Sequence, residues 1–198
     1  MIPSGVLIKG TAGVYLAERG TKRPIVDWPS FCHYKFKWNR VVTIGDAGLE
    51  AIPTGVPISR EPPFRIHKPS VLLISGKRHR GVFLMKDDIL YPFATQEAFL
   101  RLKYRFDEVV TVSDAIIAFL PKGHLIREDV LDVYGPLDER LYAAPGGGVY
   151  YADRGRLRPI ADQETFRFYK WEPDRIIPLN ARQWKKVQTG PAIRRTAP

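Results

Sequence analysis

A pattern that occurs three times constrains the fold of this chain more than any other feature. Residues 13–58, 81–126 and 148–193 align over their whole lengths without a gap. The positions shared by all three copies are Gly13/Gly81/Gly148, Val14/Val82/Val149, Pro24/Pro92/Pro159, Phe31/Phe99/Phe166, Gly55/Gly123/Gly190 and Ile58/Ile126/Ile193. Such self-similarity indicates one supersecondary unit that is repeated and that stacks on its neighbours to bury a core.

The first half of each repeat predicts a β-hairpin and a short helix. Residues 14–16 and 24–26 have the composition of short strands, and Arg19-Gly20 between them indicates a turn because glycine tolerates positive φ. The turn is Arg154-Gly155 in the third repeat and Asp87-Asp88 in the second. The side chains expected to cap the following helices are Asp27, Thr95 and Asp162.

The second half predicts a strand, a second helical turn and a closing segment that contains the shared glycine and isoleucine. Val41–Ile44 is the expected strand in the first repeat, and Asp46 and Asp114 are the expected caps of the second helical turn. The third repeat departs from this pattern, with Pro178 in place of a threonine and Ala181 in place of the aspartate.

An additional strand is expected before each repeat, at residues 6–8, 71–74 and 141–143, where it would pair with the first strand of the repeat. The predicted fold class is therefore α+β, with three tandem β-hairpin–helix–strand repeats packed into one compact array. The expected divisions are 1–58 for repeat 1, 59–126 for a connector and repeat 2, and 127–198 for a connector and repeat 3.

The repeat resembles the roughly fifty-residue repeats of bacterial and archaeal cell-surface and wall-associated proteins. The stretches that carry the resemblance are residues 22–25, 41–46, 49–55 and 109–114. The resemblance implies a non-catalytic role at a surface, in attachment or assembly. It implies no binding residues that can be assigned to positions of this chain.

No pattern of catalytic, cofactor-binding or metal-ligating residues is present. The four histidines lack ligand spacing, Cys32 does not recur in the other repeats, and the glycines of Pro145–Gly148 lack the Lys-Ser/Thr of a phosphate loop. We therefore predict that the chain is not an enzyme and has neither a cofactor nor a metal site.

Basic residues dominate the charge, which is formally +10 at pH 7. They concentrate in residues 59–80, where Lys77, Arg78 and Arg80 are expected at the tip of a hairpin. The third repeat adds Arg154, Arg156 and Arg158. Such clusters favour contact with nucleic acid or with a phosphate-bearing wall polymer, and a solvated solubilising face is the structural alternative.

Trp28 and Trp38 are the tryptophans expected to be exposed. Trp171 and Trp184 align with large apolar residues of the other repeats, so both are expected in the core, whereas Trp28 and Trp38 do not align in this way. An exposed aromatic face can stack on a sugar ring. Trp28 and Trp38 are therefore candidate partner-binding residues.

The N-terminus has neither the basic segment nor the apolar run of a signal peptide. The predicted function is a non-enzymatic structural or attachment module at a virion surface or a cell envelope, with a virion favoured over the cytoplasm. Its expected partners are other structural proteins of an assembly or an anionic or glycan envelope polymer. The alternative function is nucleic-acid binding through residues 59–80 and the third repeat.

Overall fold

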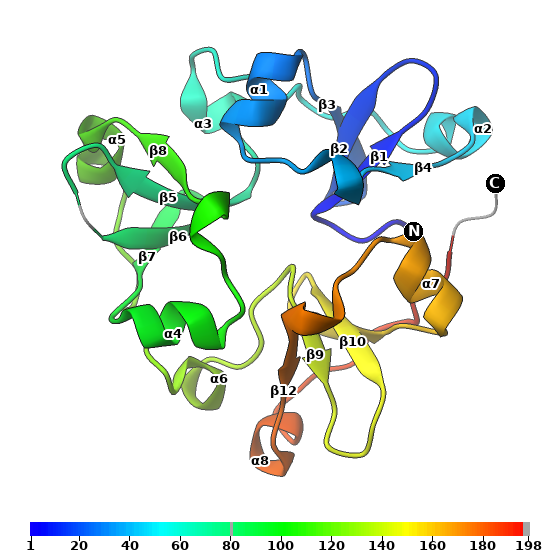
Figure 1. Ribbon diagram of the computed structural model, residues 1–198, viewed down its shortest axis with the longest axis vertical. Helices are drawn as coiled ribbons and strands as arrows, with labels where there is room; N and C mark the ends of the chain where they lie inside the picture. Colours follow the sequence, from blue (N-terminus) through cyan, green and yellow to red (C-terminus); the bar gives the residue numbers. More distant parts are fainter. Residues whose placement is uncertain (80, 196–198) are drawn as a thin grey trace. The chain divides into compact units, whose positions relative to one another are not determined.

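A computed structural model describes residues 1–79 and 81–195 and confirms an α+β fold with three tandem repeats (Figure 1). Each repeat forms one four-stranded sheet. The strands of the first sheet are β1 (Val6–Lys9), β2 (Val14–Glu18), β3 (Thr21–Pro24) and β4 (Val42–Thr43). Those of the second are β5 (Val71–Gly76), β6 (Val82–Lys86), β7 (Ile89–Pro92) and β8 (Val110–Val112). Those of the third are β9 (Leu141–Ala143), β10 (Val149–Asp153), β11 (Arg156–Pro159) and β12 (Ile176–Pro178).

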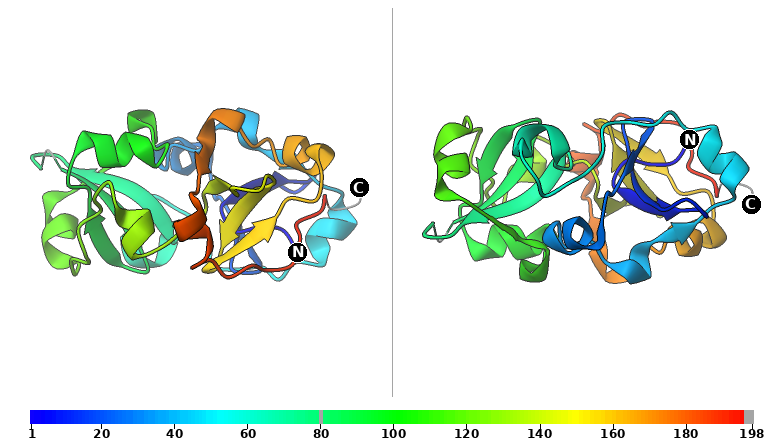
Figure 2. Two further views of the ribbon diagram at one scale, coloured as in Figure 1. Left: turned by 90° about the horizontal axis from the view of Figure 1, so that it is seen from below. Right: turned by 90° about the horizontal axis from the view of Figure 1, so that it is seen from above.

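The three sheets have the same topology. Three consecutive antiparallel strands form a meander, and the fourth strand returns parallel to the first, so the order in repeat 1 is β3-β2-β1-β4. The expected additional strands are confirmed as β1, β5 and β9, which lie in the interior of each sheet. Ile8, Ile74 and Tyr142 occupy equivalent central positions on these strands, and each is fully buried. Figure 2 shows the twist of the third sheet, in yellow.

Short helices connect the third and fourth strands and follow the fourth. The first helix of each repeat is α1 (Trp28–His33), α4 (Gln96–Arg101) or α7 (Gln163–Phe168). A 3-10 turn follows it, as η1 (Trp38–Arg40), η2 (Phe106–Glu108) or η3 (Pro173–Arg175). The second helix is α2 (Asp46–Glu50), α5 (Asp114–Phe119) or α8 (Ala181–Trp184), and the connectors contain α3 (Phe64–His67) and α6 (Val130–Val133).

The three predicted caps of the first helices are confirmed. The Asp27 carboxylate accepts from the Ser30 N–H at 2.7 Å, and Asp162 accepts from Thr165 at the same distance. The Thr95 hydroxyl accepts from the Ala98 N–H at 3.1 Å. Each bond satisfies a helical N–H group that has no partner within its helix.

The predicted hairpin turns are also confirmed by their backbone angles. Arg19-Gly20 and Arg154-Gly155 have positive φ at both residues, as a two-residue turn between twisted strands requires. Asp87-Asp88 adopts the same conformation without a glycine, with φ of 52° and 62°. Asparagine and aspartate tolerate this region better than other side chains do, which explains why the turn is kept.

The role expected for Asp46 and Asp114 was wrong. Neither carboxylate caps its own helix; each one binds the loop of the hairpin instead. Asp46 accepts from the backbone N–H and the hydroxyl of Thr11 at 3.0 and 2.8 Å. Asp114 accepts from the N–H groups of Arg78 and His79 at 3.2 and 3.4 Å. A carboxylate at this position therefore clasps the β1–β2 or β5–β6 loop to the second helix.

The third repeat lacks this clasp, and it differs both at the position of the aspartate and at the loop position that the aspartate contacts. Ala181 replaces the aspartate, and Ala144 stands where the other loops have Gly10 and Gly76. A Cβ atom on either glycine would clash with the clasping carboxylate, so alanine fits at this position once the carboxylate is gone. Asn180 now caps α8, accepting from the Gln183 N–H at 2.9 Å in a capping box.

Each closing segment lies along the third strand of its repeat and extends the sheet by a few backbone contacts. In the third repeat the Leu157 N–H donates to Gln188 O at 2.9 Å, and the Gly190 N–H donates to Leu157 O at 3.0 Å. The shared glycine is needed for this close approach. A Cβ atom at Gly55 would lie 2.8 Å from the Thr21 hydroxyl, and one at Gly123 would overlap the Tyr91 ring.

The backbone contacts divide the chain into two compact units whose boundaries differ from those of the repeats. The first unit contains residues 1–24, 37–55 and 130–198, and the second contains residues 25–36 and 56–129. In the first unit, repeats 1 and 3 share one apolar core that includes Ile8, Leu49, Tyr151 and Tyr169. The Tyr151 hydroxyl crosses between these repeats and donates to Ser4 O at 2.7 Å.

The core of the second unit is rich in aromatic rings. Phe93, Phe99 and Tyr104 contact one another with ring centroids 5.2–5.6 Å apart. Phe31 of α1 belongs to the same unit and is also buried. Figure 1 shows the sheet of repeat 2 between α4 and α5.

Candidate interaction surfaces

Trp28 stands at the first position of α1, with 60% of its surface exposed. Its indole lies nearly parallel to the ring of the buried Phe31, with centroids 5.1 Å apart and an angle of 10° between the planes. Because Phe31 fixes one face of the indole, the orientation of the other face is fixed as well. The predicted exposure of Trp28 is therefore seen in the structure.

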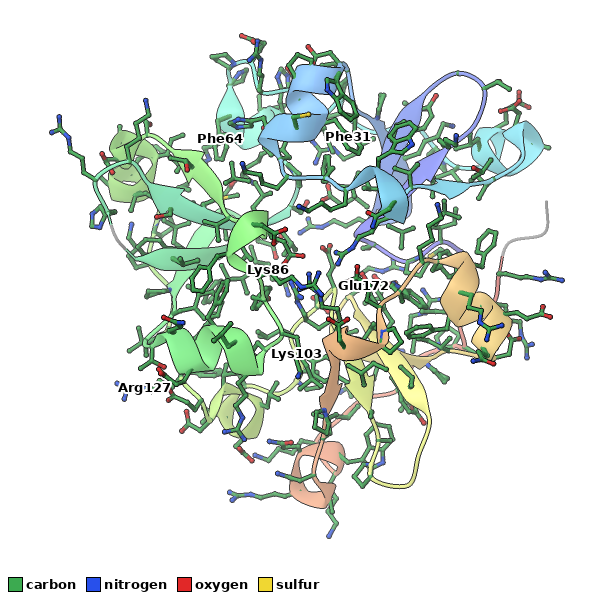
Figure 3. The ribbon with its side chains drawn as sticks, in the orientation of Figure 1. Phe31, Phe64, Lys86, Lys103, Arg127 and Glu172 are labelled. Atoms are coloured by element: carbon green, nitrogen blue, oxygen red, sulfur yellow. The ribbon has the colours of Figure 1, made fainter. Side chains whose placement is uncertain are left out.

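Trp38 begins η1 and is 52% exposed. The Lys9 ammonium lies 5.4 Å from the centroid of its ring, in a cation–π arrangement. In the same 3-10 turn, Arg40 donates at 2.6 Å to the carboxylate of Glu172, the residue before η3, and this pair links repeats 1 and 3 within the first unit. Glu172 is labelled in Figure 3. Trp38 thus has a cation as its neighbour.

The loop between β5 and β6 carries part of the predicted basic cluster. Lys77 and Arg78 are exposed there, and the Asp114 clasp holds the backbone of the loop. Arg80, the third member of the predicted cluster, lies outside the described residues. The aspartate that fixes this loop is also a negative charge beside its basic residues.

The three arginines predicted as a group in the third repeat are separated by the structure. Arg154 and Arg156 are exposed at the β10–β11 turn. Arg158 is buried, donates to the Asp153 carboxylate at 2.9 Å and donates to Pro191 O at 3.1 Å. Its guanidinium is used inside the fold, so it does not belong to the exposed basic surface.

Removing the buried pairs leaves an exposed surplus of positive charge on the third repeat. Arg175, like Arg158, is buried and paired, in its case with Glu172 at 3.2 Å. The exposed basic residues of residues 148–193 lie at the β10–β11 turn, on and just after α7, and on and just after α8. We call this set of seven the basic face: Arg154, which also lies 3.8 Å from the Asp153 carboxylate, Arg156, Arg167, Lys170, Arg182, Lys185 and Lys186. The exposed acids of the same span are Asp162, Glu164 and Asp174. The buried ion pairs therefore remove acids and bases from the surface together, and the residues that stay exposed are mostly basic.

A cluster of buried and half-buried charges that the sequence did not indicate lies in the first unit. Glu139 has a positive φ of 60° and packs its carboxyl against Gly5. The pKa of Glu139 is raised to about 8, and burial is the main cause. The nearby carboxylate of Glu18 also raises this pKa, by more than the charge of Arg140 lowers it. Glu139 is therefore protonated at neutral pH. Its position before β9, in a connector, gave no pattern that could have indicated this.

The repeat alignment also indicates exposed apolar residues, a signal that identified Trp28 but was missed for Val26 and Val56. Val26, Trp28 and Val56 are 51%, 60% and 49% exposed. The equivalent residues are Ala94, Gln96 and His124 in repeat 2, and Ala161, Gln163 and Pro191 in repeat 3. The fold accepts small or polar side chains at all three positions, so it does not require the large apolar ones of repeat 1.

The described part of the chain holds neither a metal-binding cluster nor a membrane-spanning helix. No group of three or more His, Cys, Asp or Glu side chains there is arranged to hold a metal ion. No helix in residues 1–79 and 81–195 combines the length and the apolar character that a bilayer crossing needs.

Comparisons with known proteins give one distant sequence relative. No protein-family model matches the chain. Over 101 residues the chain is 32% identical to protein CgeD of Bacillus subtilis (strain 168), a match that covers 48% of this chain and 22% of CgeD. The chain thus spans about a fifth of the length of that relative.

Two solved assemblies align with 97% of the chain at 11% identity. They are the periplasmic assembly from the ESX-5 inner membrane complex and the intact ESX-5 inner membrane complex. The alignments cover 67% and 58% of those chains, with TM-scores of 0.23 and 0.24. Scores this low carry no argument about fold or function.

Proposed function

We propose that this protein is a non-enzymatic structural or attachment module associated with a cell envelope, and that its third repeat binds an anionic polymer. The observation that carries the proposal is the basic face, where seven exposed bases accompany three exposed acids. A surplus of exposed positive charge attracts polyanions, because each neutralised phosphate releases a condensed counterion.

The architecture supports a binding role more than a catalytic one. Arg158 and Arg175 are committed to internal ion pairs, and the half-buried Glu139 packs its carboxyl against the backbone at Gly5. The resemblance to surface-protein repeats agrees with a role in attachment. We therefore favour a phosphate-bearing envelope polymer as the ligand, and a virion as one setting in which such a module would act on an envelope.

The test compares two double variants that remove the same charge from different places. Arg154→Gln/Arg156→Gln removes two bases of the basic face, and Arg101→Gln/Arg127→Gln removes two exposed bases of the second unit. Binding to purified cell walls with and without their teichoic acid is measured by co-sedimentation across a salt series. We expect the first variant to bind about tenfold more weakly and with a shallower salt dependence, and the second to bind like the wild type.

Nucleic-acid binding is the second candidate, and the same basic face supports it. Fluorescence anisotropy with duplex and single-stranded DNA, under matched salt conditions, separates the two. Tighter binding to DNA than to teichoic-acid-bearing walls would favour the nucleic-acid function. Wall binding that is equal for both double variants would refute the role of the basic face.

A further inference from the structure

The N-terminal end of α1 carries an aromatic platform whose chemistry differs from that of the basic face. Trp28 is 60% exposed, and its ring stacks on Phe31 within 10° of parallel. Phe31 is 4% exposed and labelled on α1 in Figure 3. A rigid aromatic anchor loses little conformational entropy when a ligand binds, so this platform is organised before any ligand arrives.

The platform is specific to repeat 1, although the position that holds it exists in all three repeats. Gln96 and Gln163 stand where Trp28 stands, while Phe31, Phe99 and Phe166 are common to all copies. The buried phenylalanine ring is therefore a common feature of the repeat, whereas the exposed indole of Trp28 is particular to repeat 1. An exposed indole that the fold does not need is an interaction residue by the usual expectation for exposed apolar surface.

Polar groups lie at the edge of the platform. Asp27 precedes Trp28 and is exposed, and its pKa is lowered by hydrogen bonds from Ser30, so it is a carboxylate at neutral pH. Arg60 also lies at this end of α1, where its backbone N–H donates to the Ser30 hydroxyl at 3.1 Å. Its guanidinium pairs with Glu61 at 3.4 Å and its charge helps to lower the pKa of Asp27. A carboxylate and a guanidinium at the same end of the helix as the indole supply acceptors and donors for hydroxyl groups.

The size of the exposed surface selects among occupants. A stable protein interface buries about 800 Å² on each partner, whereas one tryptophan side chain offers about 150–250 Å² in total. Val26 and Val56 enlarge the apolar surface only modestly. One sugar ring, whose C–H face packs on an indole while its hydroxyls bond to the polar edge, matches both the area and the chemistry.

We infer that Trp28, with Asp27 and Arg60 at the same end of α1, is a subsite for one pyranose ring of a glycan, for which chitotetraose is the probe. The inference rests on the attachment role proposed above and gives it a second contact, on a different repeat and of a different kind. Stacking on an uncharged sugar is insensitive to salt, whereas phosphate binding by the basic face is not. The two contacts can therefore fail independently.

The test uses the side chain that the other repeats carry. Trp28→Gln should keep the stability of the wild type, because Gln96 and Gln163 occupy the same position in folded repeats. Phe119→Ala is the matched control. It removes an exposed ring, 71% exposed, from α5 of the same unit, and Ala51 is the equivalent residue of repeat 1.

Binding of chitotetraose is measured by calorimetry and by tryptophan fluorescence at high salt. We expect the wild type and Phe119→Ala to bind alike and Trp28→Gln to bind about tenfold more weakly or not at all. Absence of chitotetraose binding by the wild type, or binding unchanged in Trp28→Gln, would overturn the inference. A wild-type dimer that Trp28→Gln dissociates in sedimentation would also overturn it, because the platform would then bind a second copy of the chain.

The test of sugar binding at Trp28 can be distinguished from the test of polymer binding by the basic face. Chitotetraose binding that survives Arg154→Gln/Arg156→Gln supports a distinct sugar subsite. Chitotetraose binding that is lost in this double variant but kept in Trp28→Gln would refute it.

Discussion

Repeats 1 and 3 stabilise the hairpin between their second and third strands with a buried ion pair, and repeat 2 does not. Glu18 pairs with Arg23 at 2.7 Å, and Asp153 pairs with Arg158 at 2.9 Å. Lys86 and Tyr91 occupy the equivalent positions of repeat 2. The same backbone therefore accepts two different solutions at these positions. The pair is a requirement of the particular repeat in which it is buried and not of the repeat fold.

The largest expected effect comes from breaking one of these pairs. Arg158→Leu would remove the closer of two cations from the Asp153 carboxylate, which is 1% exposed, and would leave it with Arg154 at 3.8 Å. We expect a loss of about 3 kcal/mol in the free energy of unfolding. The double variant Asp153→Lys/Arg158→Tyr, which installs the residues of repeat 2, should recover much of that loss. Urea unfolding of both variants measures the effect, and a double variant as unstable as Arg158→Leu would contradict the equivalence of the two solutions.

The second largest effect is a pH dependence of stability that comes from Glu139. This residue of repeat 3 is the counterpart of Gly5 in repeat 1. Their N–H groups donate to the equivalent carbonyls of Ala152 and Ala17 at 2.8 and 2.9 Å. Burial raises the pKa of Glu139 to about 8 from its ordinary value of 4.5, so unfolding at neutral pH releases a proton. Stability should therefore fall, by up to a few kcal/mol, as pH rises from about 4.5 to about 8, and then level off.

Glu139→Gln removes this titration and keeps the shape of the side chain. Its free energy of unfolding should depend less on pH over that range than that of the wild type. Parallel pH profiles for the two proteins would contradict the assignment to Glu139.

A smaller effect is expected from the loop clasp, which repeats 1 and 2 have and repeat 3 lacks. Asp114→Ala places the Ala181 of repeat 3 into repeat 2 and removes the acceptor for two backbone N–H groups. We expect a loss of about 1–2 kcal/mol and faster amide hydrogen exchange in the loop. Unchanged exchange at Arg78 and His79 would show that the loop does not depend on the clasp.

The smallest effect distinguishes the helix cap of repeat 2 from those of repeats 1 and 3. Thr95→Ala should cost about 1 kcal/mol near neutral pH, because the Thr95 hydroxyl caps α4 and does not itself titrate. The same hydroxyl donates to the Glu128 carboxylate and lowers its pKa, so only this second bond weakens in acid. The caps Asp27 and Asp162 behave differently, since hydrogen bonds from Ser30 and Thr165 lower the pKa of each. Their contribution is present above the unfolded pKa and is lost as pH falls through the folded value.

Asp162→Thr exchanges one type of cap for the other and should reduce the acid sensitivity of the protein. Thermal unfolding across an acid pH series measures the change. An acid sensitivity equal to that of the wild type would show that the Asp162 cap does not contribute to it.

The repeats allowed most of the backbone to be predicted from the sequence. Agreement among three copies identified the strands, the positive-φ turns and the caps Asp27, Thr95 and Asp162, because these features depend on residues close together in the chain. The partners of Asp46 and Asp114 could not be predicted in this way. They depend on how closely a loop more than thirty residues away approaches, and the loop of repeat 1 is shorter than those of repeats 2 and 3.

The surfaces were predicted less completely, and the reason is also physical. Trp28 and Trp38 are exposed as expected, but a charge in the sequence does not indicate whether it is paired. Arg158 was grouped with Arg154 and Arg156, and the structure buries it against Asp153. Glu139 was missed because its environment consists of backbone and charges from distant segments.

In this protein the boundaries of the sequence repeats differ from the boundaries of the two units that pack as compact bodies. Repeat 1 contributes residues 25–36 to one unit and residues 1–24 and 37–55 to the other, so the chain passes between the units at four places. If the gene grew by copying the repeat, the resulting protein cannot lose one repeat without disrupting a packing unit. Deleting residues 59–126 would remove one whole repeat from the gene, yet it would also take from α1 most of the unit to which that helix belongs.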